Sequence, residues 1–272
     1  MGGPGGRRGP GGPGGPGRRG RPEKPGNDAP SIEQLPVPLG AYGFLEQPQT
    51  RTVLVQNATI WTSGPDGVLE NADLLAVDGR IVEIGQNITP PADAVVIDAT
   101  GRHVTPGLID CHSHTGISGG VNEGGQNNTA ECRIGDVVNP DDIDFFRQLA
   151  GGLTVVNQLH GSANPIGGQN SVVKLRWGGS IDDMHLQGAK PGIKFALGEN
   201  VKRSSGYPNT RMGVATFIED AFRAGREYQA AKDRYAALSP EAQALEMPPR
   251  PDFELDAIAE ILAGERRSTV RM

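Results

Sequence analysis

The sequence has 272 residues, 36% of them hydrophobic and 21% charged, a balance typical of a globular chain with one large domain or two small ones. The formal charge is −6, but it is unevenly distributed. Residues 1–22 contain five arginines and no acidic residue, so residues 23–272 carry −11. An acidic body argues against a nucleic-acid-binding fold, and no stretch approaches the roughly 20 apolar residues of a membrane span. The two cysteines, Cys111 and Cys132, are too few for a disulfide framework.

Residues 1–49 are predicted to be a disordered arm and linker rich in Gly, Pro and Arg. The start of this arm has no apolar side chains whose burial would offset the entropy of ordering. Its pairs Arg7-Arg8 and Arg18-Arg19 could contact RNA or another anionic surface. The alternative is a linker without a binding role, and we favour the linker. The chain as written lacks a secretory signal, so localisation is open, with the cytoplasm as the default.

Residues 50–103 predict a small β-sandwich domain. Asp78-Gly79 between two apolar runs is the strongest short signal for a hairpin. No cluster of His, Cys or acidic residues occurs here, so we expect no chemistry in this domain. The predicted strands are residues 52–60, 72–77 and 80–84, and residues 95–98 and 101–104 add another short strand and a turn.

The mostly apolar run 104–109 leads directly into Asp110, Cys111, His112, Ser113 and His114. Because side chains alternate along a strand, His112 and His114 are expected on one face. Two imidazoles at a strand end are placed to bind one divalent metal ion. The alternative is a surface pair without a ligand role. We expect Asp110 to be structural and Cys111 to be a small buried residue.

The segment Val104-x-Pro106-Gly107-Leu108-Ile109-Asp110-x-His112-x-His114, with the β-rich run before it, resembles the entry strand of the amidohydrolase superfamily. This resemblance implies an α/β chain in which the small all-β domain precedes an incomplete (β/α)8 TIM-type barrel at residues 104–272. It also implies that His112 and His114 are metal ligands.

The rest of the sequence is compatible with barrel units, since strands alternate with helices or loops. Val104 to Met272 is 169 residues, whereas a complete barrel takes about 250, so we expect truncation near strand five. Exposed barrel faces should then make the chain poorly soluble or oligomeric. The expected elements are a loop at 116–135, helices at 141–150, 212–238 and 253–263, and strands at 151–159, 171–176, 192–197 and 268–272.

Within this superfamily, the segments 160–169 and 192–202 resemble the imidazolonepropionase-like amidohydrolases more closely than other members. In two-metal relatives a carboxylated lysine on strand four bridges the metals, and Lys194 stands at that place. Glu199 is the alternative ligand, because a carboxylate needs no modification. His160, at the barrel mouth, could contact substrate or metal, but we favour a loop histidine that is hydrogen-bonded to backbone. The stretch Gly167–Asn170 is expected to be a turn, and it lacks the pattern of a phosphate loop.

The resemblance implies a metal-dependent hydrolase that cleaves a C–N bond of an amide, a cyclic amide or an amino-acid derivative. We expect one or two divalent ions, with Zn as the first choice, and a small-molecule substrate. Two further histidine ligands and an aspartate general base are expected beyond residue 272, so this chain alone should be inactive. A deaminase on the same scaffold and a non-catalytic fragment are the alternatives. The folded part should bind neither nucleic acid nor membrane, and a homo-oligomer stays open.

Overall fold

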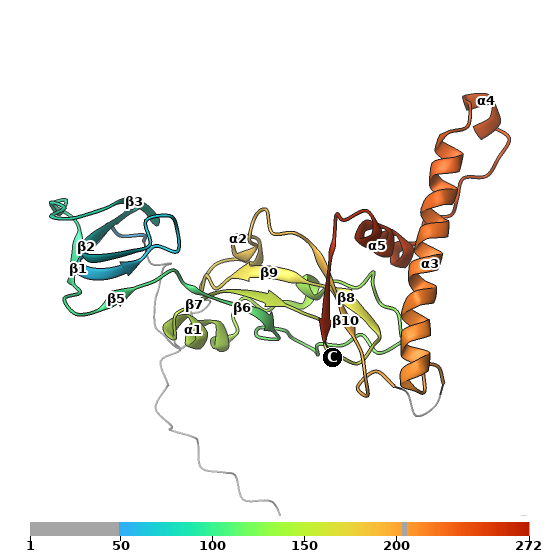
Figure 1. Ribbon diagram of the computed structural model, residues 1–272, viewed down its shortest axis with the longest axis horizontal. Helices are drawn as coiled ribbons and strands as arrows, with labels where there is room; N and C mark the ends of the chain where they lie inside the picture. Colours follow the sequence, from blue (N-terminus) through green and yellow to red (C-terminus); the bar gives the residue numbers. More distant parts are fainter. Residues whose placement is uncertain (1–48, 203–205, 272) are drawn as a thin grey trace, which may run out of the picture. The chain divides into compact units, whose positions relative to one another are not determined.

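The computed structural model describes residues 49–202 and 206–271, which form a mixed α/β chain (Figure 1). Nearly all of the predicted arm lies outside these ranges. In the described part of the chain, no helix combines the length and the apolar character needed to cross a membrane.

The first sheet confirms the β-rich reading of residues 50–103. Asp78 and Gly79 join two of its strands with φ angles of 49° and 72°, the left-handed conformations that a tight two-residue hairpin requires. The described residues of this unit make one sheet only, so the second layer of the predicted sandwich is not among them. The strands are β1 (Val53–Trp61), β2 (Val68–Val77), β3 (Arg80–Gly85), β4 (Val95–Asp98) and β5 (His103–Val104), in the order β3-β2-β1-β4 with β5 also on β1.

The second sheet carries the histidine motif. Its order is β6-β7-β9, with β6 parallel to β7 and β7 antiparallel to β9. Helix α1 (Ile143–Ala150) begins after Asp142, whose side chain accepts a hydrogen bond from the backbone N–H of Asp144. The ring of Phe145 from α1 is buried against the sheet residues Val156 and Val173. The strands are β6 (Leu108–Ser113), β7 (Leu153–Gln158) and β9 (Ser171–Lys174).

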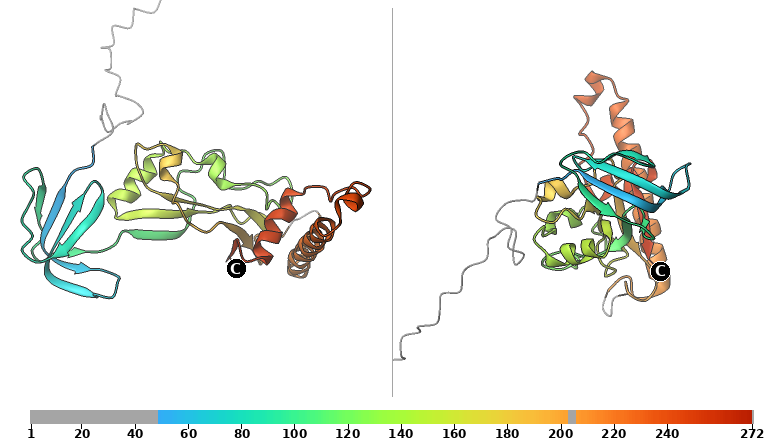
Figure 2. Two further views of the ribbon diagram at one scale, coloured as in Figure 1. Left: turned by 90° about the horizontal axis from the view of Figure 1, so that it is seen from above. Right: turned by 90° about the vertical axis from the view of Figure 1, so that its left-hand side faces the viewer.

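The third sheet has the order β11-β10-β8 and packs against two helices. Ile193 and Phe195 of β10 form a core with Ile258 of α5 and Phe222 of α3. Helices α3 and α5 also contact each other directly (Figures 1 and 2). Asp252 caps α5 as predicted, because its carboxylate accepts from the backbone N–H of Leu255. The elements are β8 (Ile166–Gln169), β10 (Gly192–Ala196), β11 (Arg267–Arg271), α3 (Arg211–Ala236) and α5 (Phe253–Leu262); short α2 (Ile181–Met184) and α4 (Pro240–Gln243) lie between them.

The expectation of consecutive parallel strands is wrong for residues 166–174. The segment Gly167–Asn170, expected to be a turn, is largely strand β8, and β9 runs antiparallel to β7. The content of the connection explains the difference. Parallel neighbours need a crossover, usually a helix, and the parallel pairs of the second and third sheets enclose helices: β6 and β7 enclose α1, while β10 and β11 enclose α3 and α5. No helix separates β7 from β9.

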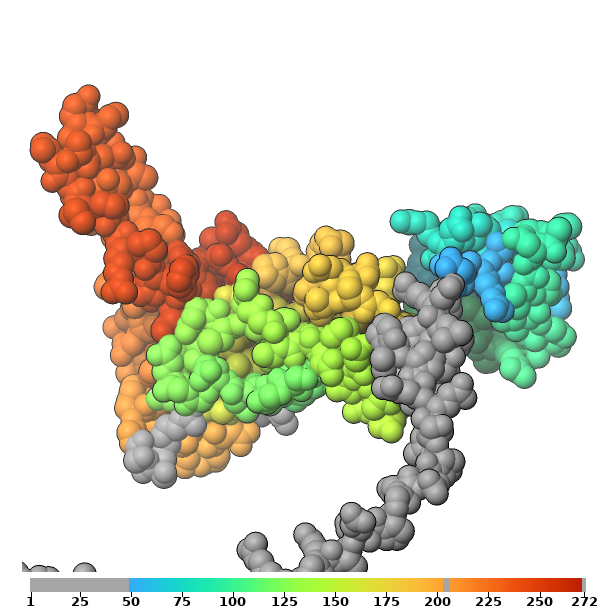
Figure 3. All heavy atoms as spheres, turned by 180° about the vertical axis from the view of Figure 1, so that it is seen from behind, coloured from blue at the N-terminus to red at the C-terminus, as the bar shows by residue number. Residues whose placement is uncertain are grey.

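A long segment, residues 114–142, connects β6 to α1 and contains the short 3₁₀ helix η2 (Ile134–Val137). Its atoms form a continuous green surface beside the orange atoms of α3 in Figure 3. Hydrogen bonds tie it to the third sheet, from Thr129 N–H to the Ile166 carbonyl and from Gln169 N–H to the Cys132 carbonyl. The predicted loop therefore joins the second and third sheets.

The outer strands expose apolar side chains. Leu108 and Ile109 on β6 are 60% and 69% exposed, and Val270 on β11 is 54% exposed. β6 and β11 are the end strands of their sheets. Cys111 is also exposed, so the expectation that it is buried is wrong. The reason is that β6 is an end strand of its sheet and its side chains become buried only at its C-terminal end, where Ser113 is 4% exposed. The expected association of the chain stays a prediction.

Candidate functional site

The two histidines of the motif lie together where β6 ends. Their ring centroids are 5.2 Å apart and the ring planes meet at 83°. Ser113, between them, is buried, as strand alternation requires. Pro106 and Gly107 lead into the strand, and Gly107 permits a close approach because a Cβ there would lie 2.2 Å from Thr154 Cγ2 of β7. The local sequence therefore places both imidazoles at one point of the sheet edge.

His114 has a defined donor and acceptor nitrogen. Its Nδ1 lies 2.9 Å from the carbonyl oxygen of Leu159. A carbonyl only accepts, so Nδ1 carries the proton and the lone pair of the neutral ring is on Nε2. Metal-binding histidines are commonly fixed in this way, by a hydrogen bond from the other ring nitrogen.

Lys194 comes from the third sheet to the same point. It is fully buried on β10, and its Nζ lies 3.3 Å from Nε2 of His112. Burial disfavours a charged ammonium. The structure thus brings together His112, His114 and Lys194, which lie on two different sheets.

Glu199, the alternative to Lys194, is found elsewhere. It follows Gly198 in the loop after β10 and forms ion pairs with Lys202 and Arg211, the latter at 2.8 Å. Hydrogen bonds from these two side chains, Lys202 first, hold the pKa of the Glu199 carboxyl below its usual value. The side chain is 55% exposed. Of the two candidates, the structure places Lys194 beside His112 and Glu199 among surface cations.

His160 follows β7 and is buried. Its Nε2 accepts from the backbone N–H of Glu123 at 2.8 Å, and its Nδ1 donates to the carbonyl of Gly161 at 2.9 Å. Burial, the largest cause, lowers the pKa of His160, which favours the neutral ring that this bonding requires. Both ring nitrogens are therefore bonded to backbone. A contact between His160 and substrate stays a prediction that requires one of these bonds to open.

An asparagine pair aligns the second and third sheets, and the sequence reading missed it. Asn170, between β8 and β9, donates to Asn157 Oδ1 at 2.6 Å and accepts from the Gly192 N–H at 2.5 Å. Asn157 donates to the carbonyl of Cys111 at 3.2 Å. This chain of bonds runs from β6 through β7 to β10, the strands that carry His112 and Lys194. The one sequence feature that could have indicated this pair is Asn157, a polar residue inside an otherwise largely apolar strand.

The side chains at this point fit part of a metal ligand set. Structural and catalytic zinc sites use three or four protein donors. Within residues 49–202 and 206–271, no group of three or more His, Cys, Asp or Glu side chains could hold a metal ion. The two histidines supply imidazole nitrogens, and Lys194 supplies a donor of another kind once its amine is neutral or carboxylated.

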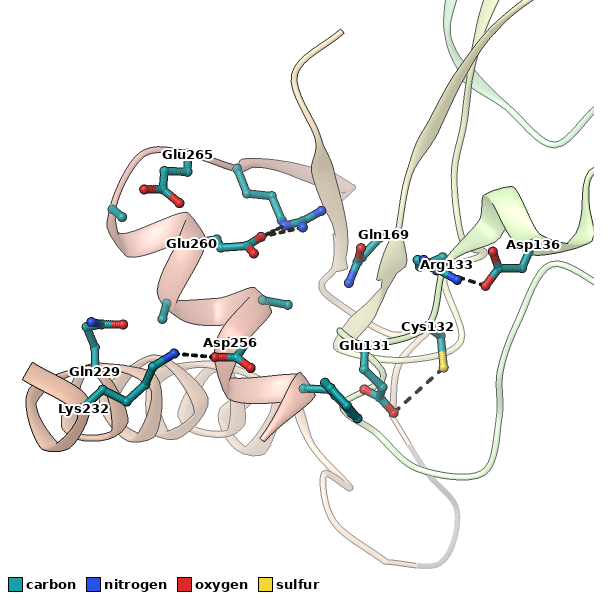
Figure 4. A pocket seen from close by; sticks show the side chains of 15 residues that line it. Glu131, Cys132, Arg133, Asp136, Gln169, Gln229, Lys232, Asp256, Glu260 and Glu265 are labelled. Carbon is teal, nitrogen blue, oxygen red and sulfur yellow. Dashed lines mark hydrogen bonds and ion pairs between the residues drawn. The ribbon is translucent and has the colours of Figure 1, made fainter. Parts of the chain in front are cut away.

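A cavity of about 1020 Å³ lies apart from these residues, between α3, α5 and the segment 131–136 (Figure 4). Ion pairs line it, namely Lys232 with Asp256, Arg266 with Glu260, and Arg133 with Asp136. None of the site residues predicted from the sequence is among its lining residues. This cavity is therefore separate from the histidine pair.

Comparison with known proteins supports the family resemblance. No family model matches the chain. The amidohydrolase tasK of Hapsidospora irregularis is 29% identical over 254 residues, covering 79% of this chain and 26% of tasK. Imidazolonepropionase of Acidiphilium cryptum is 43% identical over 77 residues, 26% of this chain and 19% of that protein. The crystal structure of an amidohydrolase from Thermotoga maritima superposes with a TM-score of 0.68 at 31% identity, over 80% of this chain and 57% of that one.

The chain therefore spans about a quarter of the length of tasK and just over half of the solved neighbour. The similarity to tasK and to the solved amidohydrolase extends over most of the chain, well beyond the histidine motif. The resemblance to amidohydrolases inferred from the sequence is thus confirmed.

Proposed function

We propose that this chain, a homologue of the amidohydrolases, supplies the first part of a divalent-metal site in a hydrolase that cleaves C–N bonds. The observation that carries the proposal is the convergence of His112, His114 and Lys194 from two sheets, with His112 Nε2 3.3 Å from Lys194 Nζ. In this proposal β6, β7, β10 and β11 are strands of a (β/α)8 barrel. The site stands at the C-terminal end of β6, the end where barrel enzymes keep their chemistry.

Each of the three side chains has its own role in the proposal. His114 presents Nε2 because the Leu159 carbonyl holds its Nδ1 proton, and His112 supplies a second imidazole nitrogen. Lys194 acts after carboxylation, in which its neutral amine attacks CO2, forms an N–C bond and releases one proton. The product carries anionic oxygens, which an ammonium lacks. A divalent cation, when bound, supplies Lewis acidity toward water and a substrate carbonyl.

The substrate class that we propose is an amide, a cyclic amide or an amino-acid derivative. A second candidate is deamination, because a 5'-deoxyadenosine deaminase of Methanosarcina acetivorans is 42% identical over 67 residues, 24% of this chain and 15% of that protein. Both reactions need water addition beside the same ligands. In barrel enzymes the loops after the strands determine which substrate is bound.

Metal titration tests the ligand assignment. The chain 1–272 should bind Co²⁺ or Zn²⁺, and the double variant His112→Ala/His114→Ala should lose this binding. The matched control is His103→Ala/His185→Ala, which removes two histidines found elsewhere: His103 bonds Trp61 Nε1 at 3.1 Å, and His185 follows α2. Equal metal binding by the two double variants would refute the assignment. A wild-type chain that binds neither ion would favour the reading as a non-catalytic chain.

A further inference from the structure

Three hydrogen bonds clamp the segment Ser113–Thr115 to the end of β7. The Leu159 N–H donates to the Ser113 carbonyl at 3.1 Å, and the Leu159 carbonyl accepts from His114 Nδ1 at 2.9 Å. The third bond comes from a side chain, because Gln158 Nε2 donates to the Thr115 carbonyl at 2.7 Å. Ser113 and Gln158 are also register partners in the β6–β7 ladder. Gln158 therefore spans the same turn that carries His114.

A second glutamine reinforces this turn from helix α1. Gln148 Nε2 lies 2.6 Å from Thr115 Oγ1, which also lies 3.1 Å from Ser113 Oγ. The two amides thus hold both the backbone and the hydroxyl of the residue that follows His114. They come from separate elements, β7 and α1, so the turn is fixed from two directions.

Both glutamines have a buried acceptor without a partner. Gln158 is 0% exposed, and neither its Oε1 nor that of Gln148 has a hydrogen-bond partner among the described residues. A buried acceptor without a partner destabilises the folded chain, so a stability argument alone favours an apolar residue at position 158. The Gln158 amide cannot be reversed, because the Thr115 carbonyl needs a donor. Gln158 thus supplies an N–H donor to the Thr115 carbonyl although its own Oε1 is buried without a partner among the described residues.

We propose that Gln158, supported by Gln148, is a positioning residue that sets which ring nitrogen His114 presents. It acts through Thr115: by holding the turn against β7, it keeps His114 Nδ1 within reach of the Leu159 carbonyl, and Nε2 is then the nitrogen left for a ligand. The role as a metal-site device rests on the proposed function. The effect on the ring tautomer does not, because it belongs to the protein without metal.

The first readout is the tautomer of His114 in the metal-free chain, from long-range ¹H–¹⁵N correlation spectra at a pH well above the usual histidine pKa. Wild type should show the Nδ1–H form. Gln158→Met keeps the length of the side chain and removes the donor, so it should show a mixture of both forms. The matched control is Gln169→Met, which loses the same kind of bond, from Nε2 to the Ala130 carbonyl at 2.9 Å, away from the histidines. It should keep the wild-type spectrum.

The second readout is Co²⁺ affinity, with the absorption spectrum of the bound ion. Loss of residues that orient metal ligands typically weakens metal binding about 10–100-fold, and we expect this for Gln158→Met but not for Gln169→Met. Should Gln158→Met not fold, Gln148→Met decides in its place, since it releases Thr115 from the other side. An unchanged His114 tautomer in the folded variant would overturn the positioning role. A shifted tautomer in a chain that binds no Co²⁺ would uphold that role and refute the metal site instead.

Discussion

Gly116 allows the loop after the histidine motif to pass over the ring of Phe145. Its φ is +70°, and an added Cβ would lie 2.2 Å from Phe145 Cζ and 2.4 Å from Cε2. Phe145 is fully buried among Val156 and Val173, so its ring has little freedom to move aside. Gly116→Ala should therefore destabilise the chain through two separate effects, backbone strain and overpacking.

The size of each effect follows from its cause. A left-handed conformation costs an L-residue about 1–2 kcal/mol. Overpacking of a filled core adds about 1–3 kcal/mol. Together they amount to about 2–5 kcal/mol, a large part of the 5–15 kcal/mol that stabilises a typical domain. At about 2–4 °C per kcal/mol for a domain of this size, Tm should fall by roughly 4–20 °C.

Gly119→Ala separates the two effects. Gly119 has a φ of +79° in the same loop, and no heavy atom of the part of the chain that the structure describes lies within 4 Å of its added Cβ. It should show the backbone cost alone, so the two variants should differ by the overpacking cost, about 1–3 kcal/mol. Thermal unfolding followed by circular dichroism measures both. Phe145→Leu should recover part of the loss in the Gly116→Ala background only. Equal Tm values for the two glycine variants would show that Phe145 does not pack beneath Gly116.

Lys194→Ala should abolish the ¹³C NMR signal of a carbamate in protein exposed to ¹³CO2 and should lower the metal content. Glu199→Gln should leave both unchanged, because Glu199 pairs with Lys202 and Arg211. The reverse ranking of the two variants would assign the ligand to Glu199. Iodoacetamide should label Cys111 before Cys132 when peptides are followed by mass spectrometry. Cys111 is exposed, whereas burial, the largest cause, and nearby acids led by Glu131 raise the pKa of Cys132, so less of its reactive thiolate is present at neutral pH. Faster labelling of Cys132 would contradict the exposure found for β6.

The sequence alone determined the features that depend on neighbouring residues. Asp78-Gly79 specified its hairpin because few other residues adopt two left-handed conformations in succession. Asp252 specified the start of α5 because a carboxylate satisfies the free N–H groups of the first turn. The alternation His112-Ser113-His114 placed two imidazoles together for the same local reason, the two-residue repeat of a strand. The amidohydrolase resemblance also rested on this contiguous segment.

Only the tertiary structure decided the features that depend on distant partners. An apolar run such as residues 171–174 carries no signal for its direction, which depends on the connection and on the strand beside it. The sequence favoured Lys194 only slightly over Glu199, and the contact of Lys194 with His112, 82 residues away, came from the tertiary structure alone. The bond from the Glu123 N–H to His160 depends on a partner 37 residues away, and Cys111 is exposed on β6, beyond which no described strand pairs. In each case the outcome depends on whether segments far apart in the chain contact each other, and no local sequence pattern encodes such a contact.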